Sequence, residues 1–203
     1  MIRNIIFDVG KVLVSYEPEA YMRKLGLDEA ARAAVNQAMF ESPLWDQADK
    51  GVMTPEEFLE AYIAGAPEYE KEIRLIHSTV GNTVELLPYV MDWIEDLKKR
   101  GYGIYILSNY GENMWNQTRD KMQFLSLADG AVFSYTCKML KPEKEIYLYL
   151  CEKYGLIPEE CVFIDDRQVN IEGGQKVGIQ GILFKDYDQA KDRLEELLSF
   201  QKE

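Results

Sequence analysis

Short apolar runs alternate with longer amphipathic stretches over the second half of the chain. The runs predict strands at residues 102–107, 131–135, 161–164 and 181–184, and the stretches predict helices at 88–100, 142–154, 169–177 and 189–198. Runs that are apolar on both sides are typical of parallel strands buried on both faces. Residues 2–7 add a strand, which we expect at the centre of the sheet because it is so apolar. The pattern therefore predicts an α/β fold with a parallel sheet covered by helices.

The spacing of apolar residues becomes helical between about residues 16 and 87, where no strand signal occurs. Phe58 and Tyr62, for example, fall on one helix face. Thr54 precedes a proline and is followed three residues later by Glu57, the pattern of a capping box at a helix start. This region is therefore expected to be a helical insert.

Two domains follow from these patterns. Residues 1–15 and 88–203 are expected to form the core domain, and residues 16–87 a small helical cap. Because the insert begins soon after the first strand, it is placed over the strand ends, where it can act as a lid.

Three carboxylates stand at the ends of apolar runs. Asp8 follows the first run, and Asp165 and Asp166 follow the run at 161–164. Open α/β sheets bind ligands outside the carboxyl ends of their strands, so these carboxylates are expected to converge. Adjacent carboxylates repel each other unless a cation joins them, and oxygen ligands favour Mg²⁺. His77 is the only histidine, which excludes a histidine zinc cluster, and we expect it to be structural.

Other strand ends contribute groups that suit a phosphoryl ligand. Ser108 and Asn109 follow the strand at 102–107, and Lys141 lies in the loop before the helix at 142–154. Each residue alone is a common turn or surface residue. Together a hydroxyl, amides and an ammonium can bind phosphoryl oxygens and neutralise charge in the transition state. Asp8 is the candidate nucleophile, which would attack phosphorus and form an aspartyl phosphate.

The charge and cysteine content narrow the possible partners and location. A formal net charge of −12 repels polyanions, so neither nucleic acid nor an anionic membrane is an expected partner. The three cysteines lack metal or redox spacing, and the chain has no apolar stretch of membrane-spanning length. The first residues lead directly into the predicted strand, so we expect no signal peptide there. We expect an ordered cytoplasmic protein, a monomer or small homo-oligomer, that acts on a small phosphorylated metabolite.

In their order and spacing these residues resemble the four motifs of the haloacid dehalogenase (HAD) superfamily of hydrolases. The matching segments are residues 7–13, residues 107–109, Lys141 with Pro142, and residues 163–166 with Asn170. The resemblance implies a Rossmann-like three-layer core, a helical cap after the first motif, and Mg²⁺-dependent phosphoryl transfer through Asp8. It also implies site roles: Lys141 is catalytic, Ser108, Asn109 and Lys141 bind phosphate, and Asp8, the Gly10 carbonyl, Asp165 and Asp166 hold or support the metal.

One position departs from the resemblance. Most phosphatases of the superfamily carry a second aspartate two residues after the nucleophile as general acid and base, and here Gly10 occupies that position. General acid–base help contributes about 10²- to 10⁴-fold, so the protein is expected to be slower, to use another group, or to act on a substrate with a good leaving group. Candidates are Lys11, Glu17 and the cap segment 45–50, although each also suits a surface or packing role. Glycine at this position also occurs in a branch of bacterial phosphatases of sugar phosphates such as glucose 1-phosphate.

The expected function is a Mg²⁺-dependent phosphatase of a small phosphomonoester, with a sugar phosphate as the favoured substrate. A 2-haloacid dehalogenase of the same superfamily is an alternative, although such enzymes generally lack the paired aspartates found at Asp165 and Asp166. A receiver-type phosphorylation switch has the opposite motif order. Gly10 leaves a third alternative, a catalytically weakened protein that binds a phosphorylated ligand or a partner.

Overall fold

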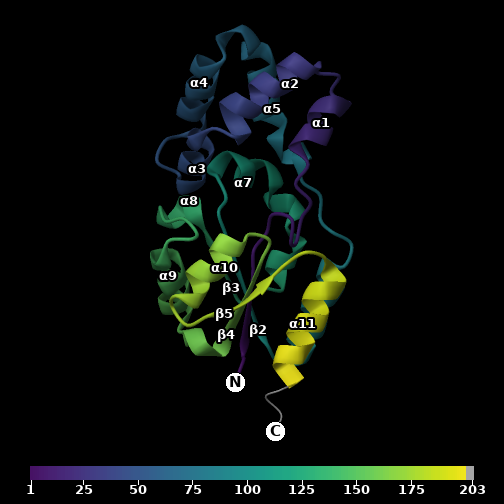
Figure 1. Ribbon diagram of the computed structural model, residues 1–203, viewed down its shortest axis with the longest axis vertical. Helices are drawn as coiled ribbons and strands as arrows, with labels where there is room; N and C mark the ends of the chain where they lie inside the picture. Colours follow the sequence, from purple (N-terminus) through teal and green to yellow (C-terminus); the bar gives the residue numbers. More distant parts are fainter. Residues whose placement is uncertain (200–203) are drawn as a thin grey trace.

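The computed structural model describes residues 1–199, in which a sheet and its helices lie below a group of further helices (Figure 1). The sheet has five parallel strands in the order β3-β2-β1-β4-β5. The strands are β1 Asn4–Phe7, β2 Gly103–Ser108, β3 Gly130–Phe133, β4 Cys161–Asp165 and β5 Gln180–Leu183. The predicted α/β class and the central position of the first strand are confirmed.

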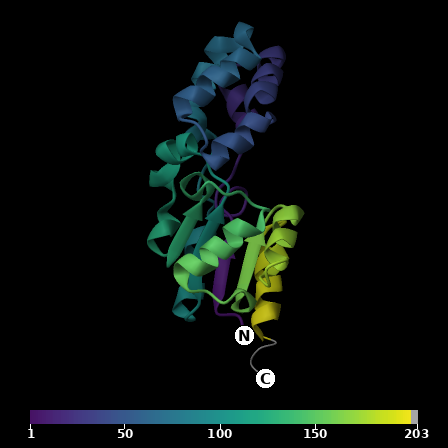
Figure 2. The ribbon, with the colours of Figure 1, turned by 90° about the vertical axis from the view of Figure 1, so that its left-hand side faces the viewer.

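Helices cover both faces of this sheet, which gives three layers (Figure 2). Helices α6 (Val90–Lys99) and α11 (Tyr187–Ser199) pack on one face, together with Ile5 and Phe7 of β1. Helices α9 (Lys144–Tyr154) and α10 (Gln168–Gln175) pack on the other face, together with Ile6. Successive residues of a strand point to opposite faces, so a strand buried on both sides must be apolar throughout.

The register of the strands brings their carboxyl ends to one level. Phe7 pairs with Ile106 of β2 and with Ile164 of β4. The Asp8 amide then donates a hydrogen bond to the Ile164 carbonyl at 2.9 Å. The residues that follow each strand therefore meet at the edge of the sheet that faces the upper helices.

The upper helices form the insert between β1 and α6. They are α1 Pro18–Lys24, α2 Glu29–Val35, α3 Pro43–Lys50, α4 Pro55–Gly65 and α5 Glu70–Thr79, with a π-helical turn at Asn36–Phe40 and 3₁₀ turns at Pro67–Tyr69 and Val80–Thr83. They bury an apolar cluster of their own that includes Met22, Phe58 and Ile73. The predicted capping box is present: Thr54 Oγ1 accepts a hydrogen bond from the Glu57 amide, and the Glu57 carboxylate accepts one from the Thr54 amide.

The chain enters and leaves the insert through two segments, 13–17 and 83–87, that lie side by side; we call them the crossing ribbon. Val14 and Leu86 form an antiparallel bridge. The Ser15 amide donates to the Glu85 carbonyl at 2.8 Å, and the Leu87 amide donates to the Leu13 carbonyl at 3.1 Å. The insert is thus joined to the core at one paired crossing.

A second set of contacts ties the insert to the core away from the ribbon. Ser134 Oγ, on the short helix α8 (Ser134–Cys137), donates to the Asp49 carbonyl at 2.5 Å, and Lys138 Nζ donates to the Gly51 carbonyl. Gly51 ends α3 with a φ of +66°, and a Cβ there would lie 2.9 Å from the Tyr135 carbonyl oxygen, so only glycine fits. Helix α3 is therefore held directly against the core.

Helix α7 (Glu112–Thr118) makes further contacts with the insert. Its Asn113 and Gln117 side chains both donate to the His77 carbonyl at 2.9 Å. Burial lowers the pKa of His77, whose ring contacts the Pro55 backbone. His77 thus lies inside the insert where it meets α7, a position that suits the structural role expected of it.

Two local predictions differ from the structure. No helix was expected between β2 and β3, because α7 is polar and buries only Met114 and Thr118. The strand expected over 131–135 ends at Phe133, because the Ser134 hydroxyl turns to accept from the Tyr110 amide at 2.8 Å while α8 begins. Among residues 1–199, no helix combines the length and hydropathy that a membrane crossing requires.

Candidate active site

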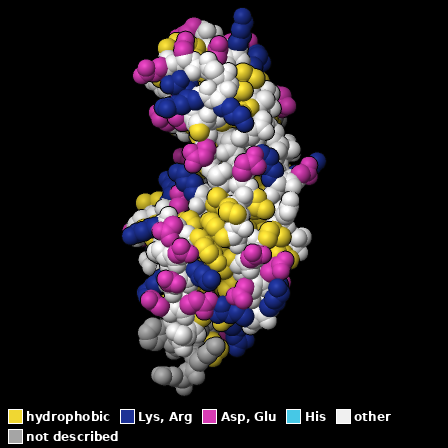
Figure 3. Space-filling view, turned by 90° about the vertical axis from the view of Figure 1, so that its right-hand side faces the viewer, with side chains coloured by type: hydrophobic (Ala, Val, Ile, Leu, Met, Phe, Trp, Pro, Cys, Tyr) yellow, Lys and Arg dark blue, Asp and Glu magenta, His cyan; other side chains and the backbone are white. Residues whose placement is uncertain are grey.

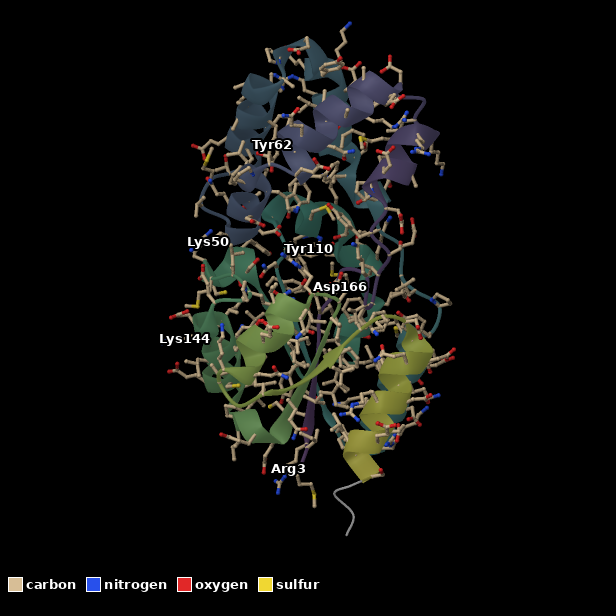
Figure 4. All side chains as sticks on the ribbon, in the orientation of Figure 1. Arg3, Lys50, Tyr62, Tyr110, Lys144 and Asp166 are labelled. Carbon is tan, nitrogen blue, oxygen red and sulfur yellow. The ribbon has the colours of Figure 1, made fainter. Side chains whose placement is uncertain are left out.

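A cavity of about 210 Å³ lies between the carboxyl edge of the sheet and the insert. Figure 4 shows two of its lining residues, Asp166 and Tyr110, in the middle of the molecule. The predicted site residues that line it are Asp8, Gly10, Ser108, Asn109, Lys141 and Asp166, and Asn170 lines it as well. Asp165 lies beneath this surface, fully buried. The structure therefore brings together the residues that the sequence singled out for catalysis, phosphate binding and metal binding.

Lys141 is the centre of a buried ion-paired network. Its Nζ lies 2.8 Å from Asp8 Oδ1 and 2.7 Å from Asp165 Oδ2, and it donates to the Leu107 carbonyl at 3.0 Å. The side chains of all three charged residues are at least nine-tenths buried. A buried ammonium is stable only when it is paired, and the two carboxylates raise the pKa of Lys141 despite its burial. Lys141 thus holds the carboxylates of β1 and β4 at a fixed spacing.

The carboxyl of Asp8 has an unusual pKa for an aspartate. Burial raises it to about 6, the Asp165 charge adds to this, and Lys141 and a hydrogen bond from Ser108 lower it. At neutral pH the group is therefore mostly ionised although it is desolvated. A desolvated carboxylate at the wall of a cavity is a good nucleophile for an electrophile placed in that cavity.

Asp165 and Asp166 are neighbours with different environments. Asp165 Oδ1 accepts from the Arg167 amide at 2.8 Å, and both its oxygens accept from Asn170 Nδ2 at 3.0 Å. With Lys141 added, the oxygens of Asp165 are fully occupied. Asp166 is only half-buried, and burial and the charge of Asp165 raise its pKa. Asp165 therefore supports the network, whereas Asp166 faces the cavity and is available to a ligand.

The oxygen atoms at this edge fit a hard cation. One carboxylate oxygen from each of Asp8, Asp165 and Asp166 lies within 4.8 Å of the others. Within residues 1–199 no group donates to the Gly10 carbonyl, and Asn170 Oδ1 is buried without a partner. Burial, and to a smaller extent the charge of Asp165, raises the pKa of Asp8 and of Asp166, and a bound cation would oppose both effects. Oxygen ligands without histidine or thiolate suit Mg²⁺.

Asn109 has a different contact from the one that a phosphate-binding side chain needs. Its Nδ2 donates to the Lys141 carbonyl at 3.0 Å, and its Oδ1 accepts from the Lys141 amide at 2.8 Å. The side chain therefore clamps the loop that carries Lys141. The Ser108 hydroxyl, by contrast, lies against the carboxyl of Asp8.

The insert supplies the opposite wall of the cavity. Trp45, Asp46 and Asp49 of α3 and Tyr16 of the crossing ribbon line it. Asp49 is buried, and its pKa rises to about 8, first because of desolvation and then because of the charges of Asp46 and Asp8. Lys141 and a hydrogen bond from the Gly111 amide lower it in part. Asp49 is therefore mostly a neutral carboxylic acid at neutral pH.

The candidates for a replacement proton donor differ in whether they line the cavity. Lys11 and, from segment 45–50, only Trp45, Asp46 and Asp49 line the cavity, whereas Glu17 does not. Lys50 pairs instead with Glu143 at 3.8 Å. The sequence did not single out Asp49, although Trp45 and Asp49 are four residues apart and share a helix face, which is the one signal that could have placed them together.

Comparison with known proteins agrees with this fold. The family model for haloacid dehalogenase-like hydrolases matches residues 2–178. The chain is 25% identical over 190 residues to a sesquiterpene phosphatase of Aspergillus oryzae, with 89% of each protein covered. It is 25% identical over 191 residues to a D-ribitol-5-phosphate phosphatase of Bacteroides thetaiotaomicron, with 89% of this chain and 90% of that protein covered.

A solved structure is similar over nearly the whole chain. It is a HAD family enzyme from Bacteroides thetaiotaomicron in complex with magnesium and inorganic phosphate. The match has a TM-score of 0.74 and 25% identity, and covers 91% of this chain and 95% of that one. The protein described here belongs to the haloacid dehalogenase-like hydrolase family.

Proposed function

We propose that the protein is a Mg²⁺-dependent phosphatase that removes phosphate from a small phosphomonoester through an aspartyl phosphate at Asp8. The observation that carries this proposal is the position of Asp8, a desolvated carboxylate held by Lys141 at the wall of a cavity that also contains Asp166. The phosphatase relatives and the family assignment support it.

Different residues of the site carry out the chemistry, bind the phosphoryl group and position the other side chains. An Asp8 oxygen attacks phosphorus, the bond from phosphorus to the leaving oxygen breaks, and water later hydrolyses the aspartyl phosphate. Lys141 and the Ser108 hydroxyl bind phosphoryl oxygens and stabilise the charge that develops there. Asn109 fixes the backbone of Lys141, and Asn170 with Lys141 fixes Asp165.

Asp8, the Gly10 carbonyl and Asp166 would hold the Mg²⁺ ion, with Asp165 behind them. The ion would neutralise part of the negative charge of the phosphoryl group and of the clustered carboxylates. The fit of these oxygens and the partnerless Asn170 Oδ1 support this assignment.

The cavity and the relatives support a small substrate. A volume of about 210 Å³ suits a metabolite, and the relative that acts on D-ribitol 5-phosphate favours a sugar or polyol phosphate. We assign the core domain to residues 1–15 and 88–203 and the cap to residues 16–87, so that the substrate binds between the two. The acidic surface, with both signs of charge mixed on the face in Figure 3, argues against nucleic acid and anionic membranes as partners.

The three free cysteines favour a reducing, cytoplasmic location. Nothing in the site needs a second copy of the chain, since residues of one chain supply both cavity walls. A monomer or a small homo-oligomer is therefore compatible with the proposed function.

The test is release of inorganic phosphate from a panel of sugar, polyol, nucleotide and aryl phosphates, with Mg²⁺ and with a chelator. Wild type is compared with Asp8→Asn and with Asp92→Asn, an exposed aspartate on α6. We expect metal-dependent turnover that Asp92→Asn keeps and Asp8→Asn reduces at least ~10⁴-fold. Turnover by Asp8→Asn at the wild-type rate would refute the aspartyl phosphate. Binding of phosphorylated ligands without turnover by the wild type would favour a binding protein instead.

A further inference from the structure

A proton donor is missing from the sheet side of the cavity. When phosphate leaves an alcohol, the departing oxygen needs a proton, because an alkoxide is a poor leaving group. Gly10 carries no side chain, Asp165 is fully engaged, and Lys141 is held as a cation between two carboxylates. With Asp166 assigned to the metal, the carboxyl groups that remain in the cavity lining, Asp46 and Asp49, belong to the opposite wall.

Asp49 has the required position and chemistry on that wall. It lines the same cavity as Asp8, and the charges of Asp8 and Lys141 both influence its pKa. Its side chain accepts a hydrogen bond from the Gly111 amide, and its carbonyl accepts one from Ser134 Oγ. The residue is thus anchored on two sides, at the wall of the cavity that Asp8 also lines.

The surroundings of Asp49 keep its carboxyl protonated and therefore able to donate. The ionisable groups around it are Asp46 on its own helix, Tyr16, Tyr62 and Tyr110 beside it, Asp8 and Lys141 across the cavity, and Glu112 and His77 in an adjoining small cavity. Burial raises the pKa of each of the three tyrosines, so none of them competes as an acid. Only Lys141 opposes the raised pKa of Asp49 with a positive charge.

We propose that Asp49, on the insert, is the general acid and base of this site, an inference that rests on the phosphatase function proposed above. In the first step Asp8 attacks phosphorus while the leaving oxygen takes the Asp49 proton, giving the alcohol, an aspartyl phosphate and an Asp49 carboxylate. In the second step that carboxylate takes a proton from the attacking water, giving inorganic phosphate, free Asp8 and protonated Asp49. Protons and charge balance over the cycle.

The decisive variant is Asp49→Asn, which has nearly the shape of the neutral acid and keeps an oxygen for the Gly111 amide. Its control is Asp92→Asn, the same substitution at an exposed aspartate of α6 that does not line the cavity. The substrates are an alkyl phosphate, whose leaving group needs a proton, and p-nitrophenyl phosphate, whose leaving group departs as a stable anion. A thermal melt of each variant establishes that it is folded.

With the alkyl phosphate we expect Asp49→Asn to lose about 10²- to 10⁴-fold in turnover. With p-nitrophenyl phosphate it should release a burst of one nitrophenolate per active site and then turn over slowly, because phosphate transfer to Asp8 proceeds while its hydrolysis lacks a base. Asp92→Asn should show no burst and should discriminate between the two substrates as the wild type does.

A loss of equal size on both substrates without a burst would overturn the assignment, as would wild-type kinetics of Asp49→Asn. In either case Asp8→Asn would still be inactive, so the phosphatase itself would stand. An inactive wild type would instead refute the proposed function. A measurement on the wild type alone adds a second test: an alkaline fall in turnover of the alkyl phosphate is expected, and a flat profile would contradict the role of Asp49.

Discussion

On the sheet side of the cavity the buried carboxylates have charged partners, whereas on the insert side the buried carboxylate lies among aromatic rings. Asp8 and Asp165 share Lys141 at distances of 2.8 and 2.7 Å. The carboxyl of Asp49 accepts a hydrogen bond from the Gly111 amide, and within residues 1–199 it forms no ion pair. Both walls desolvate an aspartate, but only one wall compensates for the loss of water.

This comparison shows that neighbouring charges and hydrogen bonds decide whether a buried carboxyl group is ionised or neutral. Burial raises the pKa of Asp8 only to about 6 because Lys141 opposes it, and raises that of Asp49 to about 8 where opposition is weaker. One cavity thereby holds an ionised carboxylate opposite a neutral one. Such a pair is what nucleophile and acid require in the same reaction.

The largest expected effect concerns the stability of the metal-free protein as pH changes. Asp49 keeps its proton in the folded protein up to about pH 8, while in the unfolded chain it loses the proton near the ordinary aspartate pKa of 3.8. The folded state binds more protons between these values, so this contribution to stability falls as pH rises from about 4 to about 8. The summed loss is on the order of 5 kcal/mol.

The Asp49→Asn variant should lack this pH-dependent contribution to the free energy of unfolding. The measurement is urea unfolding of wild type and variant at pH values from 4 to 9, and the quantity of interest is the difference between their unfolding free energies. If the unfolding free energies of wild type and variant changed in parallel with pH, Asp49 would not be buried as a neutral acid. The two walls of the cavity would then not differ in the charge of their buried carboxyl groups.

Next in size is the loss of Lys141. Lys141→Met should destabilise the protein by about 3 to 5 kcal/mol, because it leaves two buried carboxylates without their cation. It should also remove phosphate binding, measured by titration with inorganic phosphate. The double variant Lys141→Met with Asp165→Asn should recover part of the stability, since one of the two unpaired charges is then gone. A single variant as stable as wild type would show that the sheet side does not depend on ion pairing.

A smaller effect should separate the two neighbouring aspartates. Asp165→Asn should cost about 1 to 3 kcal/mol in unfolding free energy, since it disrupts hydrogen bonds from Arg167 and Asn170. Asp166→Asn should change stability little and weaken Mg²⁺ binding instead. Urea unfolding and calorimetric Mg²⁺ titration measure the two quantities, and the reverse pattern would exchange the roles given to the two residues.

The smallest effect is expected at the contact that positions Asp49. Ser134→Ala removes the hydrogen bond to the Asp49 carbonyl and the acceptor of the Tyr110 amide, at a cost of about 1 kcal/mol. The pH dependence that Asp49 contributes should shrink as the carboxyl becomes more hydrated. An unchanged pH dependence would show that α3 is held in place without Ser134.

Much of the sheet side could be predicted because topology alone places it. Parallel strands end at one edge, so Asp8, Ser108 and Asp165 had to converge once their strands were recognised. The sequence could not tell which of Asp165 and Asp166 is buried, since neighbouring residues differ only in the direction they point. The role of the Asn109 side chain also needed the structure, because its partner is the backbone of a loop 32 residues away.

The insert side was harder to predict for a physical reason. The capping box at Thr54 is local, and the sequence predicted it. Asp49, however, is buried only because α3 packs on α8 and α7, through contacts that join residues far apart in the chain. Helix α7 itself gave no signal, since its sequence has little apolar periodicity. Tertiary contacts, rather than local helix propensity, therefore determine the insert side of the cavity.

The crossing ribbon has a consequence for how the chain folds. Because Val14 and Leu86 lie side by side, the sheet can assemble around a closed loop of roughly 70 residues whether or not that loop is yet structured, at an entropic cost of about 4 kcal/mol. The helices of the loop bury an apolar cluster of their own. The two parts therefore have the means to fold as separate cooperative units, and native-state hydrogen exchange would then detect opening of the loop helices without loss of protection in β1, β2 and β4.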